Sequence, residues 1–264
     1  MTLITVVSAK HAPGATTTAL VLAAAADPLT LPIVLEGDPD GGDLAARTGT
    51  LFDPGMATLV EHARNGGTVE AIGLHAHVLS TGVRLVVGLV DPEQVRRYAD
   101  DAAAVLAPLL QRAGVLAVVD AGRWGGPAGE AWAARSHLVV VAMRPTVDSA
   151  EHVAARLPSL CRVAPAVRPL VIGDGPLRPA DIADILGCPV SFLPYEPATA
   201  RAVGEGRIGL EALRVTRLFT AAERVLTEIA VAAPSCTGAA VGSGVADRHS
   251  ARRRPTASSR RLTA

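Results

Sequence analysis

The chain has 264 residues, and its 25 basic side chains balance its 25 acidic ones. Hydrophobic residues make up 49% of the chain and aromatic residues only 3%, so a mainly disordered protein is excluded and a base-stacking surface is disfavoured. The charge balance also argues against a protein dedicated to wrapping nucleic acid. The length fits one larger domain with an aliphatic core, or two small ones.

Short apolar runs alternate with helical patterns along most of the chain. We expect strands at residues 3–8, 32–36, 77–80, 83–89, 115–119, 137–142, 170–172 and 190–193. We expect helices at residues 16–26, 56–64, 91–111, 149–160, 179–186 and 210–230. Continuous apolar strands separated by helices are typical of a mostly parallel sheet covered on both faces. The sequence therefore predicts a single α/β domain.

The alternation stops near Ala233. Residues 233–264 are rich in Ser, Gly, Ala, Thr and Arg, and their six arginines face a single aspartate. We expect a folded domain over residues 1–232, with a small negative net charge, and a disordered Arg-rich tail over residues 233–264. The tail's charge leaves contact with nucleic acid or anionic lipid open, although a solvated tail is the simpler interpretation.

No signal peptide and no membrane-spanning run is recognisable in the sequence. The first apolar stretch lacks a basic segment before it, and the run at residues 19–26 ends at Asp27-Pro28. We therefore expect a soluble cytoplasmic protein, with peripheral association at the inner membrane left open.

The first predicted strand leads into a loop with features of a phosphate-binding loop. The Walker A pattern G-x-x-x-x-G-K-[ST] is matched here by Ala9, Gly14, Ala15 and Thr16, so the second glycine and the threonine are present and the lysine is absent. A loop of this kind binds phosphate because backbone N–H groups and the helix dipole point at the anion. The only lysine of the chain, Lys10, lies in this loop and suggests a site that needs a compact ammonium group.

Carboxylates follow two of the predicted strands. Glu36, Asp38, Asp40 and Asp43 come at and after the end of the second strand, and Asp120 ends the strand at residues 115–119. Carboxylates at the ends of strands that adjoin a phosphate loop are what Mg²⁺ and an attacking water require. The order of loop, acidic segment and strand-ending aspartate predicts a P-loop nucleotide site.

At this point the sequence resembles the ParA/MinD family of deviant Walker A ATPases, whose loop has the form x-K-G-G-x-G-K-T-T. Lys10 falls on the signature lysine of that loop, Gly14 on its last glycine, and Thr16-Thr17 on its paired threonines. The segment 35–41 resembles the family's D-x-D-P-x-G switch segment, and Asp120 resembles its Walker B aspartate. The similarity implies a MinD-like P-loop NTPase fold of the SIMIBI class.

Later segments extend the resemblance over about residues 3–230. Residues 139–150 resemble the family's strand, proline and loop after Walker B. The motifs L-G-C-P-V at residues 186–190 and L-P-Y-E-P at residues 193–197 resemble its "LG-x-P-V … IP-x-D" ending.

The resemblance implies ATP and Mg²⁺ as cofactors and a nucleotide-dependent homodimer. By position, the implied nucleotide-binding residues are Lys10, Gly14, Ala15, Thr16, Thr17 and Pro194. The implied metal ligands are Thr16, Glu36, Asp38 and Asp120. In catalysis, Asp38 would help to orient the water, and Lys10 would reach the partner's phosphates.

Ala15 departs from the family pattern, since it replaces the lysine that grips the β- and γ-phosphates. Loss of one charge-assisted contact costs about 1.5–3 kcal/mol, so binding is expected to be weak and hydrolysis slow or absent. In its missing Walker lysine the sequence also resembles the TadZ/CpaE-like branch of the family, whose members act as localising factors in pilus assembly.

The favoured interpretation is a MinD/ParA-like nucleotide-binding switch that positions or regulates a larger assembly through an unidentified protein partner. One alternative is a non-hydrolysing pseudo-ATPase scaffold, or localising factor, of a pilus or secretion system. Another is a chromosome or plasmid partitioning ATPase, although the negative charge of residues 1–232 supplies no obvious basic surface for it.

Overall fold

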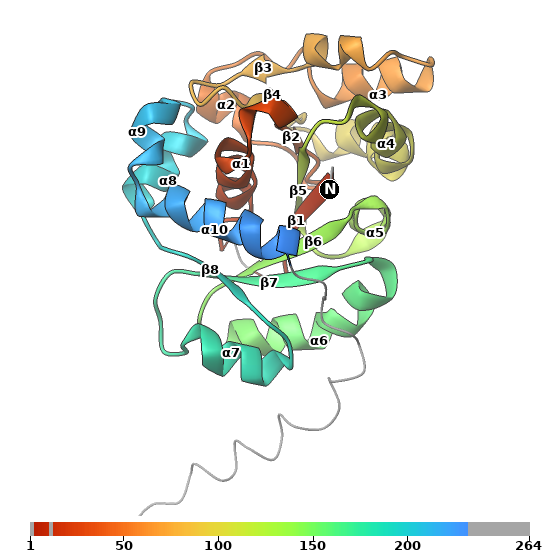
Figure 1. Cartoon of the computed structure of the whole chain (residues 1–264). Helices are drawn as coiled ribbons and strands as arrows, with labels where there is room; N and C mark the ends of the chain where they lie inside the picture. Colours follow the sequence, from red (N-terminus) through yellow and green to blue (C-terminus); the bar gives the residue numbers. More distant parts are fainter. Residues whose placement is uncertain (1–2, 11–12, 232–264) are drawn as a thin grey trace, which may run out of the picture.

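The computed structural model describes residues 3–10 and 13–231, which form a three-layer α/β/α domain (Figure 1). Its sheet has eight strands in the order β3-β4-β2-β5-β1-β6-β7-β8. All neighbouring strands are parallel except β3, which runs antiparallel to β4. The strands are β1 (Leu3–Ser8), β2 (Ile33–Glu36), β3 (His77–Val78), β4 (Arg84–Val86), β5 (Ala117–Arg123), β6 (Leu138–Met143), β7 (Val167–Ile172) and β8 (Ser191–Leu193).

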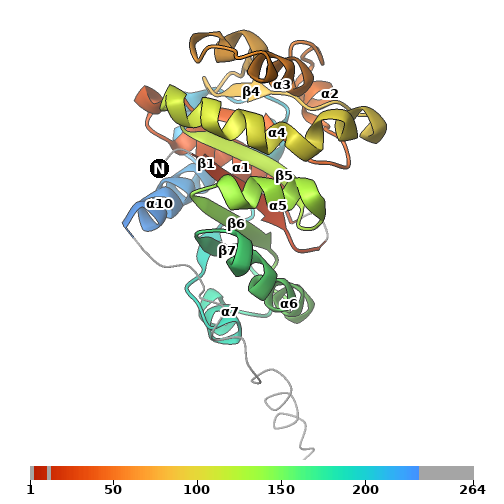
Figure 2. The same cartoon turned by 90° about the vertical axis from the view of Figure 1, so that its right-hand side faces the viewer.

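Helices cover both faces of this sheet. One face is packed by α1 (Ala15–Ala25), α2 (Leu44–Thr48), α8 (Pro197–Gly204), α9 (Leu210–Arg214) and α10 (Arg217–Val231). The other face is packed by α3 (Met56–Arg64), α4 (Pro92–Ala113), α5 (Gly126–Arg135), α6 (Val147–Val163) and α7 (Pro179–Leu186). Figure 2 shows α4 and α5 lying across that second face. Two short 3₁₀ helices, Pro28–Thr30 and Glu70–His75, complete the described elements.

The core is aliphatic, as the low aromatic content requires. Every residue of β1, β2, β6 and β7 is buried, and these strands lie at or near the centre of the sheet. Their alternate side chains enter two separate apolar clusters, one on each face. Trp132 of α5 is the largest fully buried side chain. The predicted mostly parallel α/β architecture is therefore confirmed.

Several elements differ from the expectation. The sequence patterns did not indicate α2, α5 or α8, and the single helix expected at residues 210–230 is two helices, α9 and α10. The strand expected at residues 83–89 is limited to Arg84–Val86, whereas β5 continues past Asp120 to Arg123.

The break between α9 and α10 has a local cause in Thr216. Its hydroxyl donates to the carbonyl of Leu213 at 2.7 Å, in the last turn of α9. The same oxygen accepts the N–H of Phe219 at 3.2 Å, in the first turn of α10. Thr216 therefore closes one helix and caps the next, a task for which threonine is well suited.

Replacing Thr216 by Ala should lower the free energy of unfolding by about 1 kcal/mol, because the α10 cap is lost. For a domain of this size the melting temperature should fall by roughly 2–4 °C, measurable by thermal unfolding followed by circular dichroism. Thr220→Ala is the matched control, since among the described residues the Thr220 hydroxyl bonds only back to the carbonyl of Thr216. Equal melting temperatures for the two variants would contradict the capping role.

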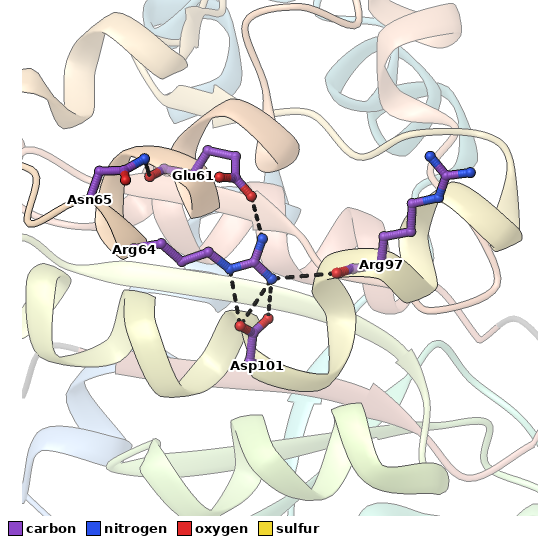
Figure 3. A network of polar contacts seen from close by, with 5 residues as sticks. All are labelled: Glu61, Arg64, Asn65, Arg97 and Asp101. Atoms are coloured by element: carbon purple, nitrogen blue, oxygen red, sulfur yellow. Dashed lines mark hydrogen bonds and ion pairs between the residues drawn. The ribbon is translucent and has the colours of Figure 1, made fainter.

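A polar network fastens the end of α3 to α4 (Figure 3). The guanidinium of Arg64 donates to both carboxylate oxygens of Asp101, at 2.8 and 2.9 Å from Nη2, and it also pairs with Glu61. These two acids raise the pKa of Arg64, and the Asp101 hydrogen bond is the main cause. Because the groups are largely exposed, we assign the network to helix orientation rather than to a large share of the stability.

None of the helices in the described part of the chain is long and apolar enough to cross a membrane. The Arg-rich tail expected at residues 233–264 and the loop residues His11 and Ala12 lie outside the described residues.

Candidate functional site

The candidate site lies at the carboxyl edge of three adjacent strands. β5 lies between β1 and β2, and Asp120 of β5 is in register with Glu36 of β2 and with Val6 of β1. Parallel strands in register direct these side chains to the same face, which is the face that α1 covers. Ligands of open α/β sheets bind at this edge, beside the strand where the order reverses, and β1 is that strand here.

The turn into α1 has the geometry of an anion-binding helix start. Gly14 adopts a left-handed conformation with φ 110°, which favours glycine, and no side chain of the described residues caps the helix. Its carbonyl accepts the N–H and the hydroxyl of Thr18, both at 2.9 Å. The N–H groups of the first turn are thus free of a side-chain cap, and the dipole adds positive potential there.

Positions 10 and 15 of the loop, where the sequence patterns place lysines, have different environments. Ala15, at the Walker lysine position, is buried in the apolar cluster of α1 and contributes no charge. Lys10 is exposed, and its Nζ lies 3.0 Å from Nε2 of His152 in α6. Nδ1 of the same ring lies 3.4 Å from Nη1 of Arg156, so both ring nitrogens of His152 face cationic donors. Lys10 is therefore held toward α6 of its own chain.

Glu36 is almost completely buried, and its carboxylate is engaged by the backbone. Oε1 accepts the N–H groups of Asp43 at 2.7 Å and Leu44 at 2.8 Å, and Oε2 accepts that of Gly88 at 2.8 Å. Burial raises the pKa of Glu36, and the three hydrogen bonds oppose this rise. The contacts link the end of β2 to the start of α2 and to the residues just after β4. They leave little of the carboxylate for a metal ion.

Asp120 is as buried as Glu36, with 3% of the residue exposed, whereas Asp38 is half-buried. Burial raises the pKa of Asp120 to about 6, although hydrogen bonding from the Thr16 hydroxyl lowers it and the charge of Asp38 raises it further. Burial likewise raises the pKa of Asp38, whose Oδ1 accepts the N–H of Asp40 at 2.9 Å. The Asp38 carboxylate lies against Gly122, where a Cβ atom would overlap it.

These groups fit Mg²⁺ held together with a phosphate. The charge of Asp120 raises the pKa of Glu36, and the charge of Asp38 raises the pKa of Asp120, so a cation between these carboxylates would relieve their repulsion. Within residues 3–10 and 13–231, no three acidic, His or Cys side chains could hold a metal ion by themselves. Mg²⁺ characteristically takes one or two protein oxygens, waters and phosphate oxygens, and the pair Thr16–Asp120 suits that requirement.

A cavity of about 520 Å³ opens beside this site, where α1, α2 and α8 meet. Thr17 of α1, Arg47 of α2 and Arg201 of α8 contribute to its lining, together with Glu205 and Arg207 after α8.

Pro194 lies elsewhere, in a cavity of about 320 Å³ that is lined mainly by residues of α10 and the turn before it. The structure thus brings Gly14, Ala15, Thr16, Thr17, Glu36, Asp38 and Asp120 together. It places Lys10 toward α6 and Pro194 in the second cavity.

Sequence reasoning missed the arginines around Thr17 and the histidine beside Lys10. Arg47, Arg201 and Arg207 have no motif of their own in a chain whose basic residues are almost all arginine. His152 is 142 residues from Lys10, and nothing in its local sequence indicates the contact. Only the three-dimensional arrangement identifies these residues.

Three solved structures illustrate what this chain is similar to. A ParA family ATPase from Chlorobium tepidum TLS matches with a TM-score of 0.73 at 14% identity, covering 86% of this chain and 98% of that one. The cell division ATPase MinD of Pyrococcus furiosus matches with a TM-score of 0.66 at 17% identity, covering 87% and 98%. MinD of Pyrococcus horikoshii OT3, complexed with Mg-ADP, matches with a TM-score of 0.63 at 16% identity, covering 87% and 97%.

No family model matches the sequence, and no curated protein matches it significantly. The eight-stranded, mostly parallel sheet and its flanking helices define the class as a three-layer α/β fold. Within that class, the similar structures show that the fold is ParA/MinD-like. At this level of identity the similarity establishes the fold, and the function is inferred from the site.

Proposed function

We propose that this protein is a nucleotide-dependent switch of the ParA/MinD type, which binds ATP with Mg²⁺ and hydrolyses it slowly or not at all. The observation that carries the proposal is the meeting of Thr16, Asp38 and Asp120 beside the uncapped start of α1. Backbone N–H groups would hold the phosphates, and Thr16 and Asp120 would hold the metal. Bound Mg²⁺ would neutralise phosphate charge, and Asp38 would orient water.

Support for weak turnover comes from position 15. The Walker lysine normally makes charge-assisted contacts to the β- and γ-phosphates, and Ala15 makes none. Its burial among apolar side chains favours the second candidate, a non-hydrolysing scaffold or localising factor for a larger assembly, such as a pilus or secretion system. A partitioning ATPase is the third candidate, and no specific feature of the site favours it.

The decisive experiment for nucleotide binding is calorimetric titration of the full chain with ATP and ADP, with and without Mg²⁺. Heat that appears with ATP and grows with Mg²⁺ supports the switch. Sedimentation with and without ATP then tests the homodimer that we propose for the ATP state. No heat under any of these conditions would overturn nucleotide binding, and heat without released phosphate would favour the non-hydrolysing candidate.

Restoring the lysine by Ala15→Lys should raise ATP affinity by about ten- to a hundredfold, because a charge-assisted contact to phosphate is regained. The measurement is the dissociation constant from the same titration. Ala15→Met adds side-chain length without charge and serves as the control, for which no gain is expected. If both variants bind like the wild type, position 15 does not face the phosphates and this part of the proposal is wrong.

A further inference from the structure

The cavity between α1, α2 and α8 contains positive charge that is not fully paired with carboxylates of the described residues. Of its three arginines, Arg207 pairs with Glu205 at 3.3 Å. Neither Arg47 nor Arg201 forms an ion pair with any side chain in the described parts of the chain. Two guanidinium groups therefore face a volume of about 520 Å³ without a carboxylate partner.

Arg47 is also close to the phosphate loop. It lines the same cavity as Thr17, which belongs to the first turn of α1. Its positive charge acts on Asp120 and lowers the pKa of that carboxyl, which places the guanidinium within electrostatic range of the proposed metal position. The cavity thus continues from the helix start that offers backbone N–H groups into a region with two free cations.

The protein positions Arg47 through two backbone features. The Glu36 carboxylate accepts the N–H groups of Asp43 and Leu44, which fixes the start of α2 three residues before Arg47. On the opposite side, Gly204 at the end of α8 leaves the space that Nη2 of Arg47 occupies, because a Cβ atom at Gly204 would overlap that nitrogen. Arg47 is exposed, and its guanidinium lies against Gly204, between α2 and α8.

We propose that this cavity binds phosphate groups, with Arg47 as the principal cation and Arg201 as the second. Guanidinium groups bind phosphate oxygens through paired hydrogen bonds, and each retains its charge at any physiological pH. Arg47 would supply from α2 the positive charge that Ala15 fails to supply from α1. The phosphate comes from the bound nucleotide, in which case the inference rests on the proposed function, or from a free polyphosphate.

The two sources are distinguished by titrating the full chain with ATP, ADP and inorganic tripolyphosphate, first without and then with Mg²⁺. Arg47→Gln should weaken binding of the phosphate ligand by about tenfold or more. Arg47→Lys keeps a charge without the paired donors and should lose less. Gly204→Ala keeps Arg47 but displaces its guanidinium, so it should also weaken binding.

Arg135→Gln, on the opposite face of the sheet, is the control and should bind like the wild type. Its only side-chain hydrogen bond within the described residues goes to the carbonyl of Ala131. Circular dichroism and the melting temperature establish that each variant is folded. Because Gly204→Ala adds only one methyl group at a helix end, it keeps the test informative even if a charge-removing variant loses stability.

Binding of ATP but not tripolyphosphate, weakened by Arg47→Gln, supports the cavity with the nucleotide as its source. Tripolyphosphate binding that depends on Arg47, without ATP binding, supports the cavity and overturns the proposed switch function. Wild-type affinity in Arg47→Gln for every ligand that binds overturns the cavity while leaving the switch function intact. No binding of any of the three ligands by the wild type overturns both.

Discussion

Asp120→Asn is expected to raise the stability of the ligand-free protein and to abolish its Mg²⁺-dependent binding of ATP. Both effects follow from a buried carboxylate whose burial is not offset by its hydrogen bonds and the charge of Arg47. Burial raises the pKa of Asp120 from 3.8 to about 6, despite hydrogen bonding from Thr16 and from the N–H of Gly122. The folded protein therefore holds a proton on this group more tightly than the unfolded chain does.

The sign of the pH dependence follows from this difference. Between about pH 4 and pH 6 the folded state carries the proton and the unfolded state has lost it, so stability falls as the pH rises through this window. Above this window Asp120 is ionised in both the folded and the unfolded state, and its burial then lowers the free energy of unfolding by at most about 3 kcal/mol. Asparagine has no charge to bury and can still accept the N–H of Gly122. At pH 8 the variant should therefore be more stable by up to that amount, and near pH 4 by much less.

Thermal unfolding between pH 4 and pH 8 measures the first effect, and ATP titration with Mg²⁺ measures the second. Asp100→Asn, at an exposed position of α4, is the control and should change neither. A variant that is no more stable than the wild type at pH 8 would show that burial of this charge is not costly. Retained Mg²⁺-dependent binding would remove Asp120 from the metal site. Higher stability together with lost binding is the result expected when a residue that serves function at a cost in stability is replaced.

The fold was predictable because its central strands are short, continuous and aliphatic, and because helical patterns separate most of them. α5 escaped prediction since it starts at Gly126-Pro127 and is rich in small residues, so its hydrophobic periodicity is weak. Its helical structure depends on tertiary packing, chiefly the burial of Trp132. The division of residues 210–230 into α9 and α10 was missed because apolar residues continue on both sides of Thr216 and no Gly or Pro marks the break.

The candidate site was predictable where it depends on strand ends. Gly14, Thr16 and Asp38 follow parallel strands, Asp120 lies in β5 in register with the last residue of β2, and the topology brings these positions to one edge. Contacts between segments distant in sequence were not predictable. Glu36 binds the N–H of a residue 52 positions later. Sequence analysis assigns Glu36 to a metal site, but in this fold three backbone N–H groups bind its carboxylate. The anchoring role and the metal-binding role predict different experimental results.

Glu36→Ala is expected to lower the free energy of unfolding by about 3 kcal/mol or more. Three N–H groups, those of Asp43, Leu44 and Gly88, would lose their acceptor, and each unpaired buried group costs about 1–3 kcal/mol. The melting temperature should fall by roughly 6–12 °C. The start of α2 would also lose its anchor, so binding that depends on Arg47 should weaken in the same variant.

Glu36→Gln separates the anchoring role from a metal-binding one. The amide oxygen can keep the bonds from Asp43 and Leu44, but the amide nitrogen would face the N–H of Gly88, and two donors repel. An anchor therefore predicts an intermediate loss of stability in the absence of any metal. A metal ligand predicts unchanged stability without metal and weaker binding of Mg²⁺ with ATP. Glu130→Ala, at an exposed position of α5, controls for the loss of a carboxylate as such. Because the two roles predict opposite results in metal-free solution, chemical denaturation with a chelator present decides between them.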